Sequence, residues 1–352
     1  MLHVNLQSIR HAIRTKTYLA EAQSVEYMLS TNPLGEEDRQ KVHASALSFV
    51  ERCRANPDKQ SLFDAFLQEY SLSSHEGVVL MCLAEALLRV PDTDTIDHLI
   101  AEEIHLGQWR KHIGNSNELL VNAASVGLSL SNKILGNKQS NDDAPNGWFH
   151  KLIQRLGEPV VRGATLQAMK LMGQQYVLGT DIKEATERGR EINAPGTRFS
   201  FDMLGEAART YEDAAKFHDA YLSAIRSIGN DNNHSDVNAA DGISVKLSAL
   251  HPRYEFSQHQ RVIDELLPSV LALEAKKFNI GLTIDAEEAA RLDIELDVFE
   301  GLAFAPELAG WDGLGFVLQA YQKRALSVVD WLVELAKSSE RKLKVRLVKG
   351  AY

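Results

Sequence analysis

The sequence has little cysteine, no excess of positive charge and no long apolar run. Its 352 residues include two cysteines, Cys53 and Cys82, which is typical of thiols kept reduced in the cytoplasm and excludes a disulfide-rich secreted scaffold. We expect both to be small buried apolar side chains. Acidic residues outnumber basic residues by 48 to 38, a formal net charge of −10, which excludes a generally basic nucleic-acid-binding chain.

Neither a membrane-spanning segment nor a secretory leader is predicted. The longest apolar stretch, Gly77–Val90, is interrupted by Glu85 and falls short of the roughly 20 residues that cross a bilayer. Residues 1–16 contain no apolar segment followed by a small-residue cleavage site. The basic residues in this segment, Arg10, Arg14 and Lys16, could contact acidic partners, but a solvated arm or helix face is the favoured interpretation.

The composition is that of a folded protein with two domains. Apolar residues make up 44% and charged residues 24% of the chain, which supplies enough material for a core, and the length favours two domains. We expect a helical arm and α-domain over residues 1–136, a linker over 137–175 and a barrel domain over 176–352.

The first half has the periodicity of helices. Ser73 and Glu76 have the spacing of a capping box, and the apolar helix pattern that follows ends at Pro91. The segment Asn137–Asn146 is polar and contains a proline, as loops do. Further helices are predicted near residues 18–29, 37–54, 60–70 and 93–106.

The second half alternates between strands and helices. Such alternation is typical of βαβ units and a parallel sheet. A helix is expected to begin at Asp181, with Glu184 three residues later. Strands are predicted at Phe199–Met203, Ile243–Leu247, Ile280–Asp285, Leu314–Gln319 and Lys342–Val348. Helices are predicted near 211–228, 257–276, 288–303 and 324–338.

Each predicted strand has one apolar face and one face that becomes polar near its carboxyl end. Lys246, Asp285 and Arg346 lie on the polar faces. A (β/α)₈ barrel with a polar site at its C-terminal face explains this pattern. A solvated antiparallel sheet is the alternative, because alternation is also its rule. We predict an α/β fold, with an all-helical N-terminal region followed by an incomplete barrel of five strands.

At these strand ends the chain resembles the proline dehydrogenase region of the bacterial proline utilization A (PutA) proteins. The barrel segments that carry the resemblance are FSFDMLGEAA, GISVKLSALHPRYE, LTIDAEEAARL, GWDGLGFVLQAYQKRA and VRLVKGAY. In the helical half it is carried by SLSSHEGVVLMCLAEALLRVPD. The resemblance covers most of the chain, and motifs this long are far more specific than a short pattern.

The resemblance implies a cytoplasmic flavoenzyme that oxidises L-proline to Δ1-pyrroline-5-carboxylate. FAD would pass the electrons to a membrane quinone, with peripheral association at the membrane, and the protein could form homo-oligomers. In the family a C-terminal aldehyde dehydrogenase domain makes the protein bifunctional. Some members also begin with a ribbon-helix-helix DNA-binding domain, and we expect no DNA-binding domain in this chain.

The resemblance also implies the residues that border the cofactor. Arg346 and Gln319 would lie against the flavin ring, near its N5 and O4 edge. Backbone groups of Val348 and Gly350, together with Ala351, would border the ring. A guanidinium is permanently charged and offers several donors to a polar ring edge, and an amide can donate to or accept from either redox state of the ring.

A second group of residues is implied to act on the substrate. Lys246 would face the proline carboxylate, with Asp285 as an acidic neighbour that keeps the lysine protonated. Tyr352 would lie beside the substrate ring. Glu206 resembles the acidic partner of an arginine that closes over the site in the family.

A complete barrel of this type takes about 250 residues, whereas residues 176–352 number 177. We therefore expect a fragment of a bifunctional PutA protein that is inactive by itself. No metal site is predicted, since His98, His105 and His112 are spaced too widely along a helix to share an ion. Two alternatives stay open: a non-enzymatic helical interaction module, and a (β/α)₈ aldolase that uses Lys246 as a Schiff-base nucleophile.

Overall fold

The computed structural model describes residues 4–31, 34–55, 177–191, 196–271 and 273–350. The chain divides into two compact units, of which one comprises Met1–Pro33 with Asp181–Tyr352 and the other Leu34–Thr180. The helices predicted near 60–70 and 93–106, the Ser73–Glu76 capping box and the linker at 137–175 lie outside the described residues. The predicted domain boundaries therefore stay a prediction.

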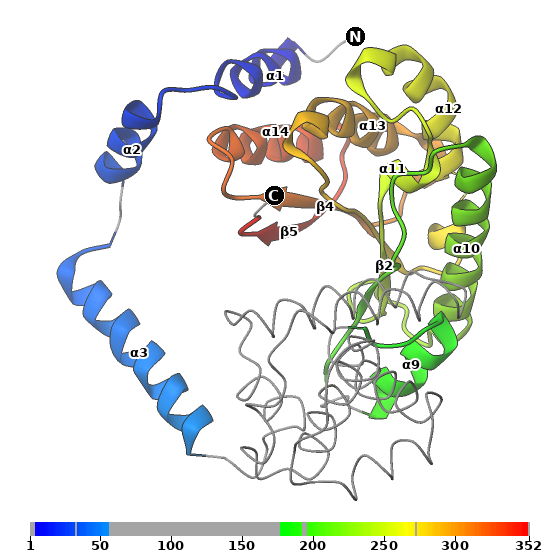
Figure 1. Ribbon diagram of the computed structural model, residues 1–352, viewed down its shortest axis with the longest axis horizontal. Helices are drawn as coiled ribbons and strands as arrows, with labels where there is room; N and C mark the ends of the chain where they lie inside the picture. Colours follow the sequence, from blue (N-terminus) through cyan, green and yellow to red (C-terminus); the bar gives the residue numbers. More distant parts are fainter. Residues whose placement is uncertain (1–3, 32–33, 56–176, 192–195, 272, 351–352) are drawn as a thin grey trace, which may run out of the picture. The chain divides into compact units, whose positions relative to one another are not determined.

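The first unit is built on a parallel sheet of five strands in the order β1-β2-β3-β4-β5 (Figure 1). Every neighbouring pair is parallel, so the parallel half-barrel is confirmed and the antiparallel alternative is wrong. All five predicted strands are present, and the fourth has the predicted ends. The strands are β1 (Ser200–Asp202), β2 (Gly242–Val245), β3 (Gly281–Ile284), β4 (Leu314–Gln319) and β5 (Lys344–Val348).

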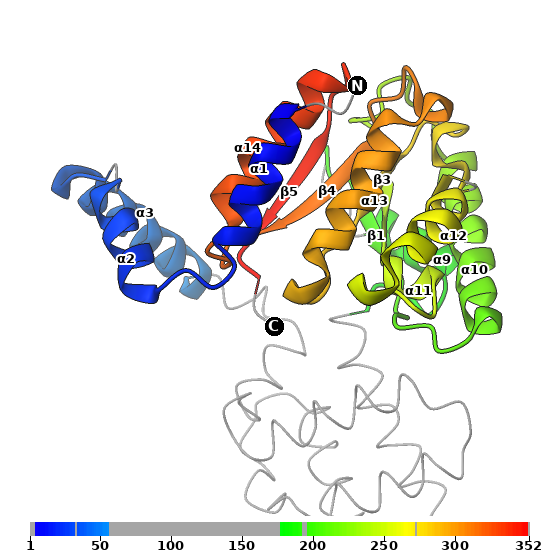
Figure 2. The same ribbon diagram turned by 90° about the horizontal axis from the view of Figure 1, so that it is seen from above.

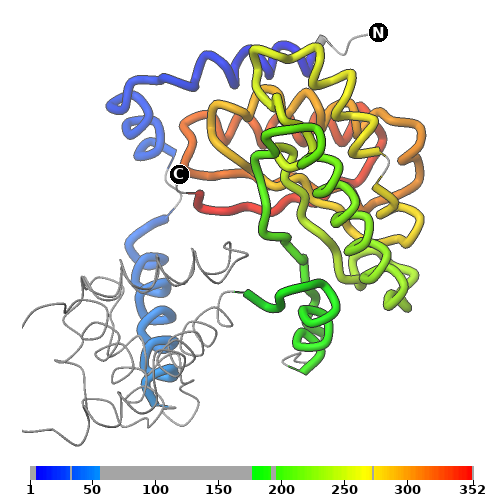
Figure 3. The backbone as a smooth tube through the Cα atoms, turned by 45° about the vertical axis from the view of Figure 1, so that its right-hand side comes forward, coloured from blue at the N-terminus to red at the C-terminus, as the bar shows by residue number. Residues whose placement is uncertain are grey.

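Helices connect successive strands and lie together on the outer side of the sheet (Figures 2 and 3). Two of them begin at side-chain caps: Asp181 Oδ1 accepts from the Glu184 N–H of α9 at 2.8 Å, and Thr210 forms a capping box with Asp213 of α10. The α-helices are α9 (Ile182–Glu191), α10 (Tyr211–Asn230), α11 (Leu247–Leu250), α12 (His259–Leu271), α13 (Leu292–Phe304) and α14 (Ala325–Ser338). Short 3₁₀ helices occur at Phe256–Gln258, Glu274–Lys276, Ala289–Arg291 and Pro306–Leu308.

The core lies between the sheet and these helices. Phe299 of α13 and Phe316 of β4 are both fully buried, with ring centroids 5.0 Å apart. Trp331 of α14 is also fully buried. The apolar side chains of β2, β3 and β4 are thus used for packing on helices, as the alternation predicts, and polar groups lie on the opposite face.

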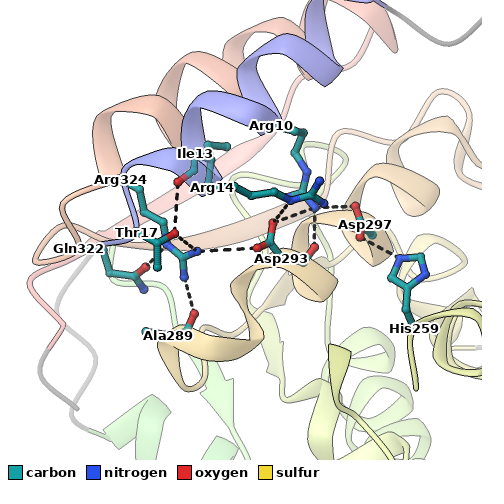
Figure 4. Close-up of polar contacts among 10 residues, drawn as sticks. All are labelled: Arg10, Ile13, Arg14, Thr17, His259, Ala289, Asp293, Asp297, Gln322 and Arg324. Carbon is teal, nitrogen blue, oxygen red and sulfur yellow. Dashed lines mark hydrogen bonds and ion pairs between the residues drawn. The ribbon is translucent and has the colours of Figure 1, made fainter. Parts of the chain in front are cut away.

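An N-terminal helix, α1 (Val4–Thr15), packs along α14 in the same unit (Figures 1 and 2). Leu6 and Ile13 are buried by this packing. Arg10 Nη2 donates to Asp297 Oδ1 at 2.6 Å and to the Asp293 carbonyl at 2.7 Å (Figure 4). The favoured interpretation of this basic segment as a solvated arm or helix face is wrong for Arg10, which is nearly buried and paired with acidic residues of α13. Arg14 also pairs with Asp293 but is half-exposed, and Lys16 donates to Ser327 of α14.

Two further helices follow α1. They are α2 (Glu21–Ser30) and α3 (Glu36–Arg54), close to the predicted ranges 18–29 and 37–54. Cys53 is exposed on α3, so its expected burial is wrong. Cys82 lies outside the described residues.

The ion pairs of α1 predict that Arg10 contributes more to the stability of the fold than Arg14 does. Arg10 is nearly buried, with 7% of its side chain exposed, whereas Arg14 is 50% exposed. We expect Arg10→Ala to lower the free energy of unfolding by about 2–3 kcal/mol, because it leaves the carboxylates of α13 without their buried partner. The control Arg14→Ala should cost less than about 1 kcal/mol. Urea denaturation measures both, and equal losses would contradict the assignment.

The outer surface of β5 predicts self-association of a polypeptide with this sequence. Val345 and Leu347 are 51% and 68% exposed, and among the described strands β5 pairs with β4 alone. An apolar strand with a free edge pairs readily with another chain. We expect light scattering to detect oligomers of the 352-residue polypeptide, and Leu347→Lys to reduce them. A monodisperse monomer would refute this prediction.

Candidate active site at the carboxyl ends of the strands

Three charged side chains meet where the first three strands end. Lys246 directly follows β2, Asp202 is the last residue of β1, and Asp285 directly follows β3. Lys246 Nζ donates to Asp285 Oδ2 at 2.6 Å and to both carboxylate oxygens of Asp202 at 3.0 Å. The structure therefore brings together the predicted pair, Lys246 and Asp285, with a second carboxylate.

The lysine in this cluster is held in its charged form. Burial alone would lower the pKa of Lys246, but the hydrogen bonds and charges of Asp285 and Asp202 outweigh that effect and raise the pKa above its ordinary value. Its ion-pair contribution to stability is therefore fully present below the ordinary lysine pKa and is lost only as the pH rises through the higher folded value. A Schiff-base lysine must be neutral to attack, so this environment does not favour the aldolase alternative.

The backbone beside the lysine is also fixed. The Lys246 N–H donates to the Tyr221 hydroxyl oxygen at 3.2 Å. Tyr221 is fully buried in α10, and burial raises its pKa to about 12, so the phenol is neutral. The end of β2 is thus anchored to the helix layer behind it.

Arg346 extends from β5 across the inner face of the sheet. Its Nη1 donates to Ser244 Oγ on β2 at 3.1 Å, and its Nη2 donates to Ser200 Oγ on β1 at 2.5 Å. Because β1 and β5 are at opposite ends of the strand order, these bonds require a strongly curved sheet. Two hydroxyls occupy only part of the five N–H donors of a guanidinium, and no carboxylate among the described residues forms an ion pair with Arg346.

Gln319 ends β4 on the same inner face and is 4% exposed. Its Oε1 accepts from Gln322 Nε2 at 2.7 Å, and its Nε2 donates to the Glu287 carbonyl at 3.3 Å. The amide is therefore oriented by two neighbours. The carbonyl of Val348 accepts from the Ala320 N–H at 2.8 Å.

Gly350 occupies a position that only glycine fits. Its φ is +73°, and a Cβ atom there would lie 2.6 Å from Tyr321 Cδ1 and 3.0 Å from Gln319 Cβ. The backbone after β5 can thus lie close to the end of β4. Ala351 and Tyr352 lie outside the described residues.

Glu206 is not part of this cluster. It is exposed in the loop after β1, and no hydrogen bond or ion pair joins it to another of the described residues. The loop itself is attached to α11, because the Ala207 N–H donates to Ser248 Oγ at 3.0 Å.

The sequence analysis missed Glu287, a largely buried carboxyl two residues after Asp285. It accepts from the Ser248 N–H at 2.9 Å and pairs with Arg291 at 3.1 Å. Burial raises its pKa above the ordinary value. The signal was available, because Glu287 and Arg291 are four residues apart within the segment LTIDAEEAARL.

The part of the chain that the structure describes lacks two further features. There, no group of three or more histidine, cysteine, aspartate or glutamate side chains is arranged to hold a metal ion. None of the helices described is both long and apolar enough to cross a membrane.

Comparison with known families decides what this arrangement belongs to. Residues 185–352 match the model of the proline dehydrogenase family, and residues 62–176 match a model described as the DNA-binding domain of proline dehydrogenase. The chain belongs to the PutA proline dehydrogenase family. Proline dehydrogenases are flavin-dependent oxidoreductases.

Similar proteins support the same assignment. The chain is 45% identical over 352 residues to the bifunctional protein PutA of Klebsiella aerogenes, and it spans 27% of that protein. It is 26% identical over 207 residues to proline dehydrogenase 2 of Bacillus subtilis strain 168, an alignment that covers 59% of this chain and 57% of that protein. It also resembles the crystal structure of the Bradyrhizobium japonicum PutA mutant D779Y, with a TM-score of 0.62, 43% identity, and coverage of 94% of this chain and 33% of that one. The chain thus spans about a quarter to a third of the PutA proteins that it matches.

The match at residues 62–176 disagrees with one expectation. We expected no DNA-binding domain in this chain, whereas the description of this family model names one. These residues lie outside the part that the structure describes, so the disagreement rests on the family match.

The geometry around Lys246 predicts that Asp285 contributes more to the stability of the fold than Asp202 does. Asp285 is 18% exposed and Asp202 is 49% exposed. We expect Asp285→Ala to lower the free energy of unfolding by about 2 kcal/mol, because the shorter charged hydrogen bond lies in the drier environment. Asp202→Ala, the matched control, should cost less than about 1 kcal/mol. Denaturant titration of both variants tests this order, and a larger loss for Asp202→Ala would reverse it.

Proposed function

We propose that this chain contributes to a flavin-dependent oxidation of L-proline to Δ1-pyrroline-5-carboxylate. The observation that carries the proposal is the convergence of Lys246, Asp285, Gln319 and Arg346 on the inner face of the half-barrel, in a chain of the proline dehydrogenase family. Carboxyl ends of barrel strands are where active sites lie in this architecture.

The inner face carries donors that suit a flavin ring. Arg346 has N–H donors beyond those bound to Ser200 and Ser244, and it has no carboxylate partner among the described residues, so a polar ring edge that becomes more negative on reduction would satisfy it. Gln319 can donate or accept beside it. A bound flavin would supply the two-electron oxidation of the C–N bond, and these residues would orient it. We propose FAD as that flavin.

The charged side chains on the same inner face suit an amino acid as substrate. Lys246 carries one positive charge between two carboxylates, and Arg346 adds a second positive charge. A site with both signs fits a substrate that has an amine and a carboxylate. We propose that the proline carboxylate takes the N–H groups of Lys246 that otherwise bond to the more exposed Asp202, while Asp285 holds the lysine in place. Tyr352 beside the substrate ring, Ala351 at the flavin and Glu206 as part of a gate complete the proposed set.

The wider setting of the reaction is also a proposal. The PutA relatives are described as bifunctional and are much longer than this chain. We propose a membrane quinone as electron acceptor, a cytoplasmic protein that associates peripherally with the membrane, a C-terminal aldehyde dehydrogenase domain and a homo-oligomeric state. An interaction module without enzymatic activity would bind no flavin, which separates that alternative from this proposal.

The test is made on the full-length protein. We expect Arg346→Met to lower the flavin content, measured by absorbance after dialysis, and to slow proline-dependent dye reduction about tenfold or more, the effect of losing a charged hydrogen bond. Arg346→Lys keeps the charge without the planar donor array and should recover only part of the loss. Lys246→Met should retain flavin and instead raise the KM for proline. A wild-type protein that binds no flavin, or that does not turn over proline, would refute the proposed function.

A further inference from the structure

A small cavity lies directly behind the proposed flavin edge. Its volume is about 10 Å³, close to the minimum for one water molecule. Gln319, Gln322 and Glu295 of α13 are among the residues that line it. Apolar side chains, among them Leu292, Val317 and Val328, form most of the remaining lining.

Glu295 is a buried carboxyl group that the proposed reaction does not use. It is 3% exposed, and its Oε1 atom has no hydrogen-bond partner among the described residues. Burial raises its pKa well above the ordinary value, the charges of Glu287 and Asp285 raise it further, and Arg324 opposes them. No ion pair to Glu295 occurs among the described residues, and a carboxyl group buried without a charged partner is neutral. A neutral carboxylic acid offers one O–H donor and acceptor oxygens.

Gln319 has hydrogen-bonding capacity left on this side. Gln322 occupies one acceptor position of its Oε1, and the Glu287 carbonyl takes one hydrogen of its Nε2. A primary amide has a second donor hydrogen and a second acceptor lone pair. A cavity of this size, lined by the amide of Gln319 and by the carboxyl residue Glu295 among apolar side chains, suits one buried water that bonds to both polar groups.

We propose that Glu295 is a positioning residue that acts through one water bound in this cavity to fix the side-chain amide of Gln319 at the flavin edge. The inference rests on the proposed function, because only that function places Gln319 against a flavin. The link between Glu295 and Gln319 is a property of the protein itself and can be tested with or without the flavin.

Infrared spectroscopy measures this link. The carbonyl stretch of a protonated carboxylic acid is separate from that of a carboxylate, and a difference spectrum between wild type and Glu295→Gln isolates the band of Glu295. We expect this band at neutral pH in the flavin-free full-length protein, and we expect its frequency to change in Gln319→Leu because the bridging water loses a partner. Glu307→Gln, which alters an exposed carboxylate, is the control and should leave the band unchanged.

Flavin loading then tests the positioning role. The Glu295 band should shift between the oxidised and the chemically reduced protein, and this redox shift should disappear in Gln319→Leu. Glu295→Leu should lower kcat for proline on the order of tenfold, as loss of an outer-shell partner does at metal sites, while Glu295→Gln, which keeps a donor and an acceptor, loses less. Absence of the band, or a band indifferent to Gln319→Leu, would overturn the inference. A protein that binds no flavin but shows that coupling would refute the function and leave the Glu295–Gln319 link intact.

Discussion

The structure depends on the pairing of charges inside a curved parallel sheet. A buried charge is costly unless a partner compensates it, and Lys246 satisfies this requirement by joining the ends of β1, β2 and β3 through Asp202 and Asp285. Arg346 joins the sheet in another way, through hydrogen bonds from β5 to the neutral serine hydroxyls of β1 and β2. The polar groups that would receive substrate and flavin are thus placed by one another as much as by the strands that carry them.

Helix α13 connects this inner face to the outside of the unit. Asp293 and Asp297 are four residues apart and share the helix face that holds Arg10 of α1 (Figure 4), whereas Glu295 lies between them in sequence and faces the cavity behind Gln319. Alternate acidic residues of α13 therefore contact α1 on one side and line the cavity behind Gln319 on the other.

The sequence predicts the architecture well because the signals for it are local. The alternation along Leu314–Gln319 gives β4 its observed ends, and the placement of Lys246 and Asp285 just after neighbouring strands predicts their contact, since parallel strands bring their carboxyl ends to the same edge. The role of Arg10 could not be read in this way, because its partners are more than 280 residues away. Glu295 was missed for a related reason: an acidic residue in a helix is usually solvated, and only packing reveals its burial.

The attachment of α1 to α13 has a consequence for the order of events during synthesis. Arg10 is made early, yet its partner Asp297 follows 287 positions later. The entropy of closing such a loop grows only slowly with its length, so the delay costs time more than stability. Until then, Leu6 and Ile13, which the finished protein buries, have no surface on which to pack. The apolar side chains of α1 can therefore be buried only after α14, the helix of the fourth strand–helix unit, has been made.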